Sequence, residues 1–201
     1  MTVRVTLVSA AMSTGLREAR FDDGGPLEPA GLQQARAAAT AFAPGGRAFA
    51  SPSARCAQTA AALGLAAEPA PALAGCAMGR WTGRPLAEVA AAEGDAVARW
   101  LADPDAAPHG GESLTAFLAR VSSWLDGQLE SVRGELATNP GGPIVAVVEP
   151  DVVRAAAMHA LGAPAPAFWR LDVRPLTVTE LSGRAGRWNV RWGSPAEAGT
   201  R

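Results

Sequence analysis

The 201-residue chain has few of the residues from which catalytic and metal sites are commonly built: two histidines, two cysteines and no lysine. Cys56 and Cys76 match neither the spacing of a metal site nor that of a redox motif. We interpret both as reduced, structural thiols, with a disulfide as the less favoured alternative, and we expect no metal. Arginine carries all 18 positive charges, which suggests a GC-rich genome more than a function.

A strong net charge and a long apolar run are also missing. The formal net charge is −1, so nothing in the charge balance favours nucleic acid or an anionic membrane as a partner. No run of 18 apolar residues is present, and Arg4 is followed by a strand-length run rather than by the apolar core of a signal peptide. We therefore expect a cytoplasmic protein, and the length suits one domain.

Short apolar runs alternate with helical patterns along the chain. Residues 3–8 and 144–148 are almost wholly apolar or β-branched, which is typical of strands buried on both faces of a parallel sheet. The spacing further predicts helices over residues 29–42, 85–92, 97–102, 113–136 and 150–161, and a turn within 51–60 that opens a helix lasting to about 63. It predicts strands over 47–50, 168–173, 176–181 and 187–192, a loop over 16–25 and a turn over 139–143. This order indicates a three-layer α/β/α sandwich with a mostly parallel sheet. We expect a single domain over residues 1–193 and a disordered tail over 194–201.

A ligand site is expected just after Val8, because open α/β sheets bind ligands at the carboxyl ends of their strands. The residues there are Ser9, Ala10, Ala11 and Met12, which carry no charge, no histidine and no glycine-rich phosphate loop.

Motifs in a fixed order nevertheless resemble those of a known family. The first of four, LVSAAMS, resembles the family's LVRHGET, and the second, SPSARCAQTA, resembles SPLxRAxQTA. The third, MGRWTG with HGGES, resembles GxWEG with PGGES, and the fourth, IVAVVEPDVVRAAAMHALG, resembles VVSHGGVIRALL. The family that these four motifs resemble is the histidine phosphatase superfamily, the phosphoglycerate mutase-like fold. The resemblance extends from Val3 to about Gly162. The matching residues are Ser51, Pro52, Arg55, Gln58, Thr59, Ala60, Gly79, Trp81, Gly83, Gly110, Gly111, Glu112, Ser113 and Arg154, and the pair Arg20 and Phe21 also fits the first loop.

The resemblance implies a chemistry whose residues are largely absent from this chain. In the family a histidine attacks phosphorus, a second histidine and two arginines neutralise the phosphoryl oxygens, and an acid protonates the leaving group. The RHG triplet falls on Ser9, Ala10 and Ala11, the late histidine on Glu149, and the acid on Gly75. Only Arg55 remains of this set. Alanine cannot attack phosphorus, and a carboxylate at position 149 repels a phosphoryl group.

Three functions stay open at this stage. The favoured one is a catalytically degenerate family member, a pseudoenzyme that binds a small molecule or a protein. The second is an enzyme with non-phosphatase acid–base chemistry at Glu149, Asp151 and Arg55, with His109 as a further candidate. The third is residual phosphomonoesterase or phosphoglycerate mutase-like activity. We expect no cofactor, an unidentified small-molecule or protein partner, and a monomer or homodimer. The candidate pocket residues are Ser9, Ser13, Arg20, Arg55, Trp81, His109, Glu149 and Asp151.

Each candidate also has a simpler interpretation. Arg20 fits a solvated rim, His109 a solvated loop, and Trp81 the packing of a core. Asp151 fits the first turn of a helix, where the dipole favours a carboxylate. His159 and the other tryptophans are interpreted as packing or surface residues.

For Glu149 we predict an ion pair with Arg55, because the resemblance places both at neighbouring strand ends and an unpaired arginine in a cleft is unfavourable. The alternative is that Glu149 caps the helix that begins at Pro150.

Overall fold

A computed structural model describes residues 2–21, 24–42, 46–134 and 143–196. At its centre is a six-stranded sheet in the order β3-β2-β4-β1-β5-β6. The strands are β1 (Val3–Ser9), β2 (Arg47–Ala50), β3 (Glu68–Pro69), β4 (Ile144–Val148), β5 (Thr177–Arg184) and β6 (Arg187–Pro195). Strands β3, β2, β4 and β1 are mutually parallel, whereas β5 runs antiparallel to both β1 and β6. The predicted mostly parallel sheet is confirmed.

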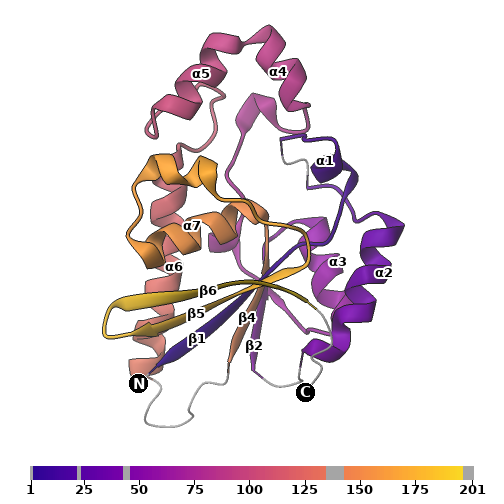
Figure 1. The fold of residues 1–201 in the computed structure, drawn as a ribbon, viewed down its shortest axis with the longest axis vertical. Helices are drawn as coiled ribbons and strands as arrows, with labels where there is room; N and C mark the ends of the chain where they lie inside the picture. Colours follow the sequence, from indigo (N-terminus) through magenta and orange to yellow (C-terminus); the bar gives the residue numbers. More distant parts are fainter. Residues whose placement is uncertain (1, 22–23, 43–45, 135–142, 197–201) are drawn as a thin grey trace.

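Helices cover both faces of the sheet and extend beyond one end of it (Figure 1). Helices α6 and α7 lie on one face, and α2 and α3 lie on the other. Helices α4 and α5 lie beyond the carboxyl ends of β1, β2 and β4, where they form a cap over the sheet. The helix bounds are α1 (Thr14–Arg17), α2 (Pro29–Ala38), α3 (Ala54–Ala62), α4 (Leu86–Ala92), α5 (Gly94–Ala102), α6 (Leu114–Gly134) and α7 (Pro150–Leu161), with 3-10 helices η1 (Ala39–Ala41), η2 (Pro71–Leu73), η3 (Gly79–Trp81) and η5 (Ala165–Arg170). No helix among the described residues is long and apolar enough to cross a bilayer.

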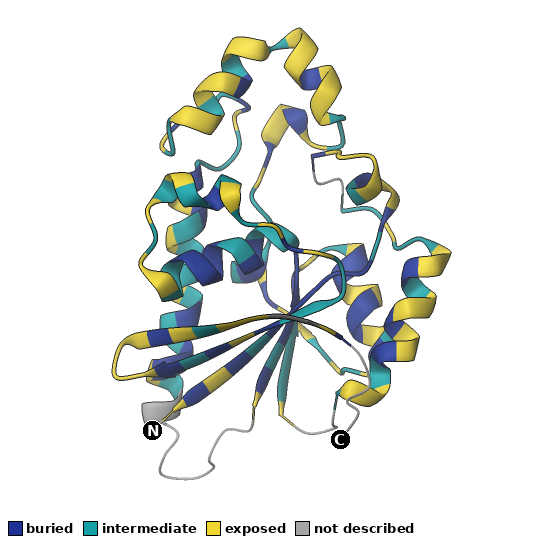
Figure 2. Ribbon diagram, viewed as in Figure 1, coloured by how far each residue is buried: buried dark blue, intermediate teal, exposed yellow. Residues whose placement is uncertain are grey.

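The two central strands are buried on both faces over their last three residues, whereas Arg4 near the start of β1 is exposed (Figure 2). Val5 and Leu7 of β1 belong to the core beneath α6 and α7, whereas Val8 belongs to the core beneath α3. Strand β4 alternates in the same way, with Ala146 on the first side and Val147 on the second. The carboxyl ends of β1 and β4 lie side by side in this buried pairing, and the site lies there.

A separate, aromatic cluster joins the cap to the rest of the molecule. We call it the ring cluster: Phe21, Trp81, Trp100, His109, Phe168 and Trp169. Trp81 is fully buried, and its ring centroid lies 5.2 Å from that of Phe21 and 5.8 Å from that of Trp100. Trp100 of α5 in turn meets Trp169 of η5 edge-on at 4.4 Å. Contacts between aromatic rings thus connect the cap to the loop that follows α7.

The structure corrects several of the predicted elements. Residues 168–173 are not a strand: 165–170 form the 3-10 helix η5, because Pro164 and Pro166 fix a helix-compatible φ and cannot donate to a strand ladder. The loop predicted over 16–25 contains the end of α1, whose N-cap is Ser13. Strand β6 continues through Ser194 to Pro195, beyond the predicted start of the tail. Residues 197–201, and 139–142 of the predicted turn, lie outside the described residues.

Candidate functional site

Arg55 and Glu149 meet at the carboxyl ends of two neighbouring parallel strands. Arg55 lies in the first turn of α3, which follows β2, and Glu149 directly follows β4. Oε2 of Glu149 accepts a hydrogen bond from Nε of Arg55 at 2.6 Å and lies 2.6 Å from Nη2 of the same guanidinium. Their side chains are 6% and 2% exposed. The predicted ion pair is therefore present, and it is shielded from solvent.

The second carboxylate oxygen of Glu149 is occupied as well. Oε1 accepts a hydrogen bond from Oγ of Ser53 at 2.6 Å and one from the thiol of Cys56 at 3.4 Å. Glu149 is the N-cap residue of α7 by position, but its side chain makes no capping hydrogen bond. The alternative interpretation as a helix cap does not hold. We call Arg55, Glu149 and Ser53 the floor of the site.

The residues at the end of β1 take part in packing rather than in the floor. Oγ of Ser9 donates to the carbonyl of Arg174 at 2.6 Å, in the segment before β5. Ala10 and Ala11 are buried, and the amide of Ala11 donates to Oγ1 of Thr59 at 3.1 Å. Ser13 is the one serine of this stretch that reaches the floor, since its Oγ accepts from Nη1 of Arg55 at 3.3 Å.

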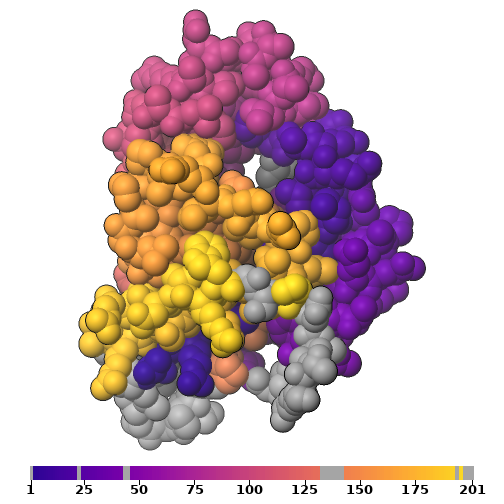
Figure 3. Space-filling view, in the orientation of Figure 1, coloured from indigo at the N-terminus to yellow at the C-terminus, as the bar shows by residue number. Residues whose placement is uncertain are grey.

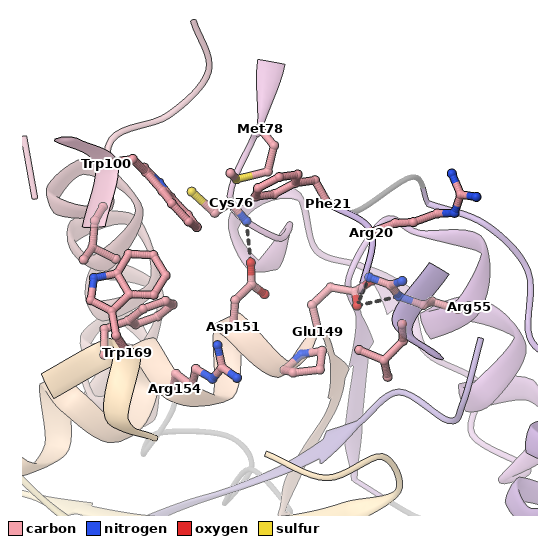
Figure 4. A pocket seen from close by; sticks show the side chains of 14 residues that line it. Arg20, Phe21, Arg55, Cys76, Met78, Trp100, Glu149, Asp151, Arg154 and Trp169 are labelled. Atoms are coloured by element: carbon pink, nitrogen blue, oxygen red, sulfur yellow. Dashed lines mark hydrogen bonds and ion pairs between the residues drawn. The ribbon is translucent and has the colours of Figure 1, made fainter. Parts of the chain in front are cut away.

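A pocket of about 220 Å³ opens above the floor. Figure 3 shows the surface hollowed between the segment around α1, in indigo, and the α7–η5 region, in orange. The close-up in Figure 4 shows Trp100 and Trp169 on one side of the pocket and Arg55 and Glu149 on the other, with Phe21 above and between them. The lining residues are Leu16, Arg20, Phe21, Arg55, Cys76, Met78, Trp100, Leu114, Glu149, Pro150, Asp151, Arg154, Phe168 and Trp169. Four of the predicted pocket residues are among them: Arg20, Arg55, Glu149 and Asp151.

His109 and Trp81 do not line this pocket. His109 is 1% exposed and lies against Trp81, with ring centroids 5.0 Å apart. Its Nδ1 accepts from the amide of Gly111 at 3.0 Å, and its Nε2 is buried without a hydrogen-bond partner. Burial, together with the positive charge of Arg80, lowers the pKa of His109. Both the solvated-loop and the pocket interpretations of His109 are wrong, whereas the packing interpretation of Trp81 is supported by the structure.

Asp151 is held by backbone amides on two sides. Its Oδ2 accepts from the amide of Cys76 at 2.8 Å, next to the predicted site position Gly75, and its Oδ1 accepts from Val152 at 2.8 Å. Burial, with the negative charge of Asp151 and then Glu112, raises the pKa of Cys76 to about 12. The Cys76 thiol is therefore neutral at physiological pH, and it cannot act in the pocket as a thiolate nucleophile.

Sequence reasoning did not assign Arg154, Trp100 or Trp169 to the pocket. Arg154 lies one turn after Asp151 on α7, and its Cζ lies 5.7 Å from the centroid of Phe168. The spacing from Asp151 to Arg154 on one helix face was a usable signal for the arginine. No local pattern indicates the two tryptophans, which are 69 positions apart in the chain. Within the described ranges, no three His, Cys, Asp or Glu side chains come together to hold a metal ion.

The fold and the position of this site define a phosphoglycerate mutase-like α/β protein. A sequence model of the histidine phosphatase superfamily (branch 1) matches residues 14–194. The chain thus belongs to the histidine phosphatase superfamily. None of the curated proteins compared with the chain matches it significantly.

Solved structures of similar proteins include several phosphatases. One described as mycobacterial hydrolase 1 is 25% identical, with a TM-score of 0.82 over 97% of this chain and 100% of its own. A mycobacterial glucosyl-3-phosphoglycerate phosphatase is 25% identical, with a TM-score of 0.78 over 94% of this chain and 97% of its own. A putative alpha-ribazole-5'-P phosphatase from Escherichia coli shares the fold, at 19% identity and a TM-score of 0.81, over 99% of each chain.

Proposed function

We propose that this protein is a histidine phosphatase family member that has lost phosphoryl transfer and binds a small molecule in the pocket above the floor. The observation that carries the proposal is the occupied floor. Both oxygens of Glu149 are engaged by Arg55 and Ser53, at the strand ends where the family resemblance places the phosphoryl group. A buried carboxylate in that place repels a phosphate and already neutralises the arginine.

The residues that follow β1 support the same proposal. The family resemblance puts the attacking histidine at position 10, which is alanine here and is buried. The match to the family sequence model begins at residue 14, after this stretch. The neutral thiol of Cys76 adds no substitute nucleophile.

An acid–base enzyme at Glu149 and Asp151 is the second candidate, and the hydrogen bonds count against it. The oxygens of Glu149 accept from three side chains, and those of Asp151 accept from two backbone amides. A general base needs an oxygen that can reach the proton of a substrate. The cytoplasmic location and the monomeric or homodimeric state stay predictions.

The direct test is an activity assay on the purified protein. We expect no turnover of para-nitrophenyl phosphate or 3-phosphoglycerate above that of the double variant Arg55→Met/Glu149→Gln, which removes both charges of the floor. Turnover by the natural chain clearly above this control would overturn the proposal.

Anion binding tests whether Glu149 keeps phosphate away from Arg55, and this test does not depend on the absence of enzymatic turnover. Because a ligand stabilises a protein only as far as it occupies the native state, millimolar phosphate, sulfate or vanadate should leave the melting temperature nearly unchanged. Glu149→Gln removes the competing carboxylate, so the variant should gain a phosphate-dependent rise in melting temperature. A large, saturable rise in the natural chain would contradict the proposal.

A further inference from the structure

Arg154 differs from the other two arginines of the pocket in having no charged partner among the described residues. Arg55 is paired with Glu149, and Arg20 bonds Glu18 through Nε at 2.7 Å. Nε of Arg154 is buried and has no hydrogen-bond partner, and the group's contact with the ring of Phe168 is a cation–π contact at 5.7 Å. A buried guanidinium donor without an acceptor is unfavourable, so this place favours a ligand that supplies one.

The wall around Arg154 is aromatic. Trp100 and Trp169 are 4.4 Å apart with their planes at 65°, and Phe168 meets Trp169 at 4.9 Å and 88°. In Figure 4 Trp100 and Trp169 lie on the same side of the pocket as Arg154, whereas Arg55 and Glu149 lie on the opposite side. Aromatic walls favour flat aromatic ligands, which bind them through edge-to-face or offset contacts.

The size and charge of the pocket further limit the class of ligand that it can bind. About 220 Å³ is less than the roughly 300–1,000 Å³ of sites for drug-sized ligands, and so it suits a single small ring system. Asp151 precedes Arg154 by one helical turn and Glu149 lies across the pocket, so a second negative charge on the ligand would be repelled. A carboxylate carries one charge, and its two oxygens fit the planar fork of arginine.

We propose that the pocket binds a small aromatic carboxylate, such as an arylacetate, with its carboxylate on the guanidinium of Arg154 and its ring against Trp100 and Trp169. This inference rests on the proposed function, because it requires the floor to be closed to phosphate. It assigns the negative group of the ligand to a helix-borne arginine away from the strand ends.

Isothermal titration calorimetry on the full chain tests the inference with paired probes. Indole-3-acetate should bind, and its neutral amide, indole-3-acetamide, should bind at least about tenfold more weakly, since it carries no charge to form an ion pair with the arginine. Phenyl phosphate should also bind more weakly than indole-3-acetate, because the two carboxylates repel its second charge.

Variants assign the effect to Arg154. Arg154→Gln should weaken indole-3-acetate binding about tenfold or more while changing indole-3-acetamide binding less than about twofold. Arg170→Gln is the matched control, since Arg170 is exposed on η5, does not line the pocket, and loses the same charge. It should leave both affinities unchanged. Arg154→Lys keeps the charge without the planar fork and should recover only part of the affinity.

Three outcomes would each overturn the inference: no binding of indole-3-acetate at millimolar concentration, equal binding of the acid and the amide, or tighter binding of phenyl phosphate. None of these outcomes would contradict the proposed loss of phosphoryl transfer, which is overturned only if the protein turns over phosphate esters. Conversely, turnover of phosphate esters together with Arg154-dependent binding of indole-3-acetate would overturn the proposed function and leave the arginine as an anion site.

Discussion

The floor and the aromatic wall of the pocket each contain an arginine, and the two arginines differ in whether a carboxylate neutralises them. On the floor, Glu149 and Arg55 satisfy each other and both are nearly inaccessible to solvent. On the wall, Arg154 has aromatic neighbours and no carboxylate partner among the described residues. The position of a site in a fold and its capacity to bind a ligand are thus separate properties. The site lies at the strand ends, where the fold predicts it, whereas the pocket arginine without a carboxylate partner among the described residues is Arg154 on α7.

The largest expected effect comes from breaking the floor. Arg55→Met or Glu149→Gln alone removes one member of a buried ion pair, which should destabilise the fold by about 3–5 kcal/mol. The double variant removes both charges and should cost clearly less than the sum of the two single changes. Urea unfolding of all four proteins measures this interaction. Additive effects would mean that the two side chains do not stabilise each other.

The packing of the loop before α6 against the loop before η3 can be tested at two adjacent glycines. A Cβ on Gly111 would lie 1.9 Å from the carbonyl oxygen of Ala77, whereas a Cβ on Gly110 meets nothing within 4 Å. Gly111→Ala should therefore cost about 3 kcal/mol, because the backbone of the neighbouring loop has to move. Gly110→Ala should cost about 1 kcal/mol, from its left-handed φ of +75° alone. Equal losses in a urea titration would show that the Ala77 loop yields easily.

The smallest expected effect is a pH dependence inside the ring cluster. Burial lowers the pKa of His109 from its usual 6.5, so the unfolded chain binds the proton more readily than the folded one. The contribution of neutral His109 to the free energy of unfolding is fully present above pH 6.5. It is lost as the pH falls from there toward the lower pKa of the folded state. His109→Gln cannot take up a proton, so its unfolding free energy should fall less between pH 7.5 and 5. A variant with the unchanged slope would place the pH dependence elsewhere.

The features predicted best from sequence are those that leave a continuous apolar run or a recognisable family motif in the chain. Strands β1 and β4 were predicted because double burial requires uninterrupted apolar runs. The pairing of Arg55 with Glu149 followed from the family resemblance, since adjacent parallel strands bring their ends together. Strand β3 was missed because it contains only Glu68 and Pro69 and pairs with β2 through two residues.

The wall of the pocket could not be predicted for a different physical reason. Trp100 and Trp169 meet through the packing of α5 on η5, and the last three residues of η5 fall in the strand predicted over residues 168–173. His109 was placed in solvent because its neighbours are proline and two glycines. Its burial depends on Trp81 and Trp100, which no local pattern connects to it.

Glu149 can also be considered as a ligand that is covalently attached to its own binding site. A flexible tether gives an attached group an effective concentration in the millimolar range, and Glu149 is held more tightly, between β4 and α7. A free anion competing for Arg55 has to displace a group that never diffuses away. The folded state consequently needs no phosphate from its surroundings to neutralise the arginine, and the scaffold keeps its stability whatever the supply of phosphorylated metabolites.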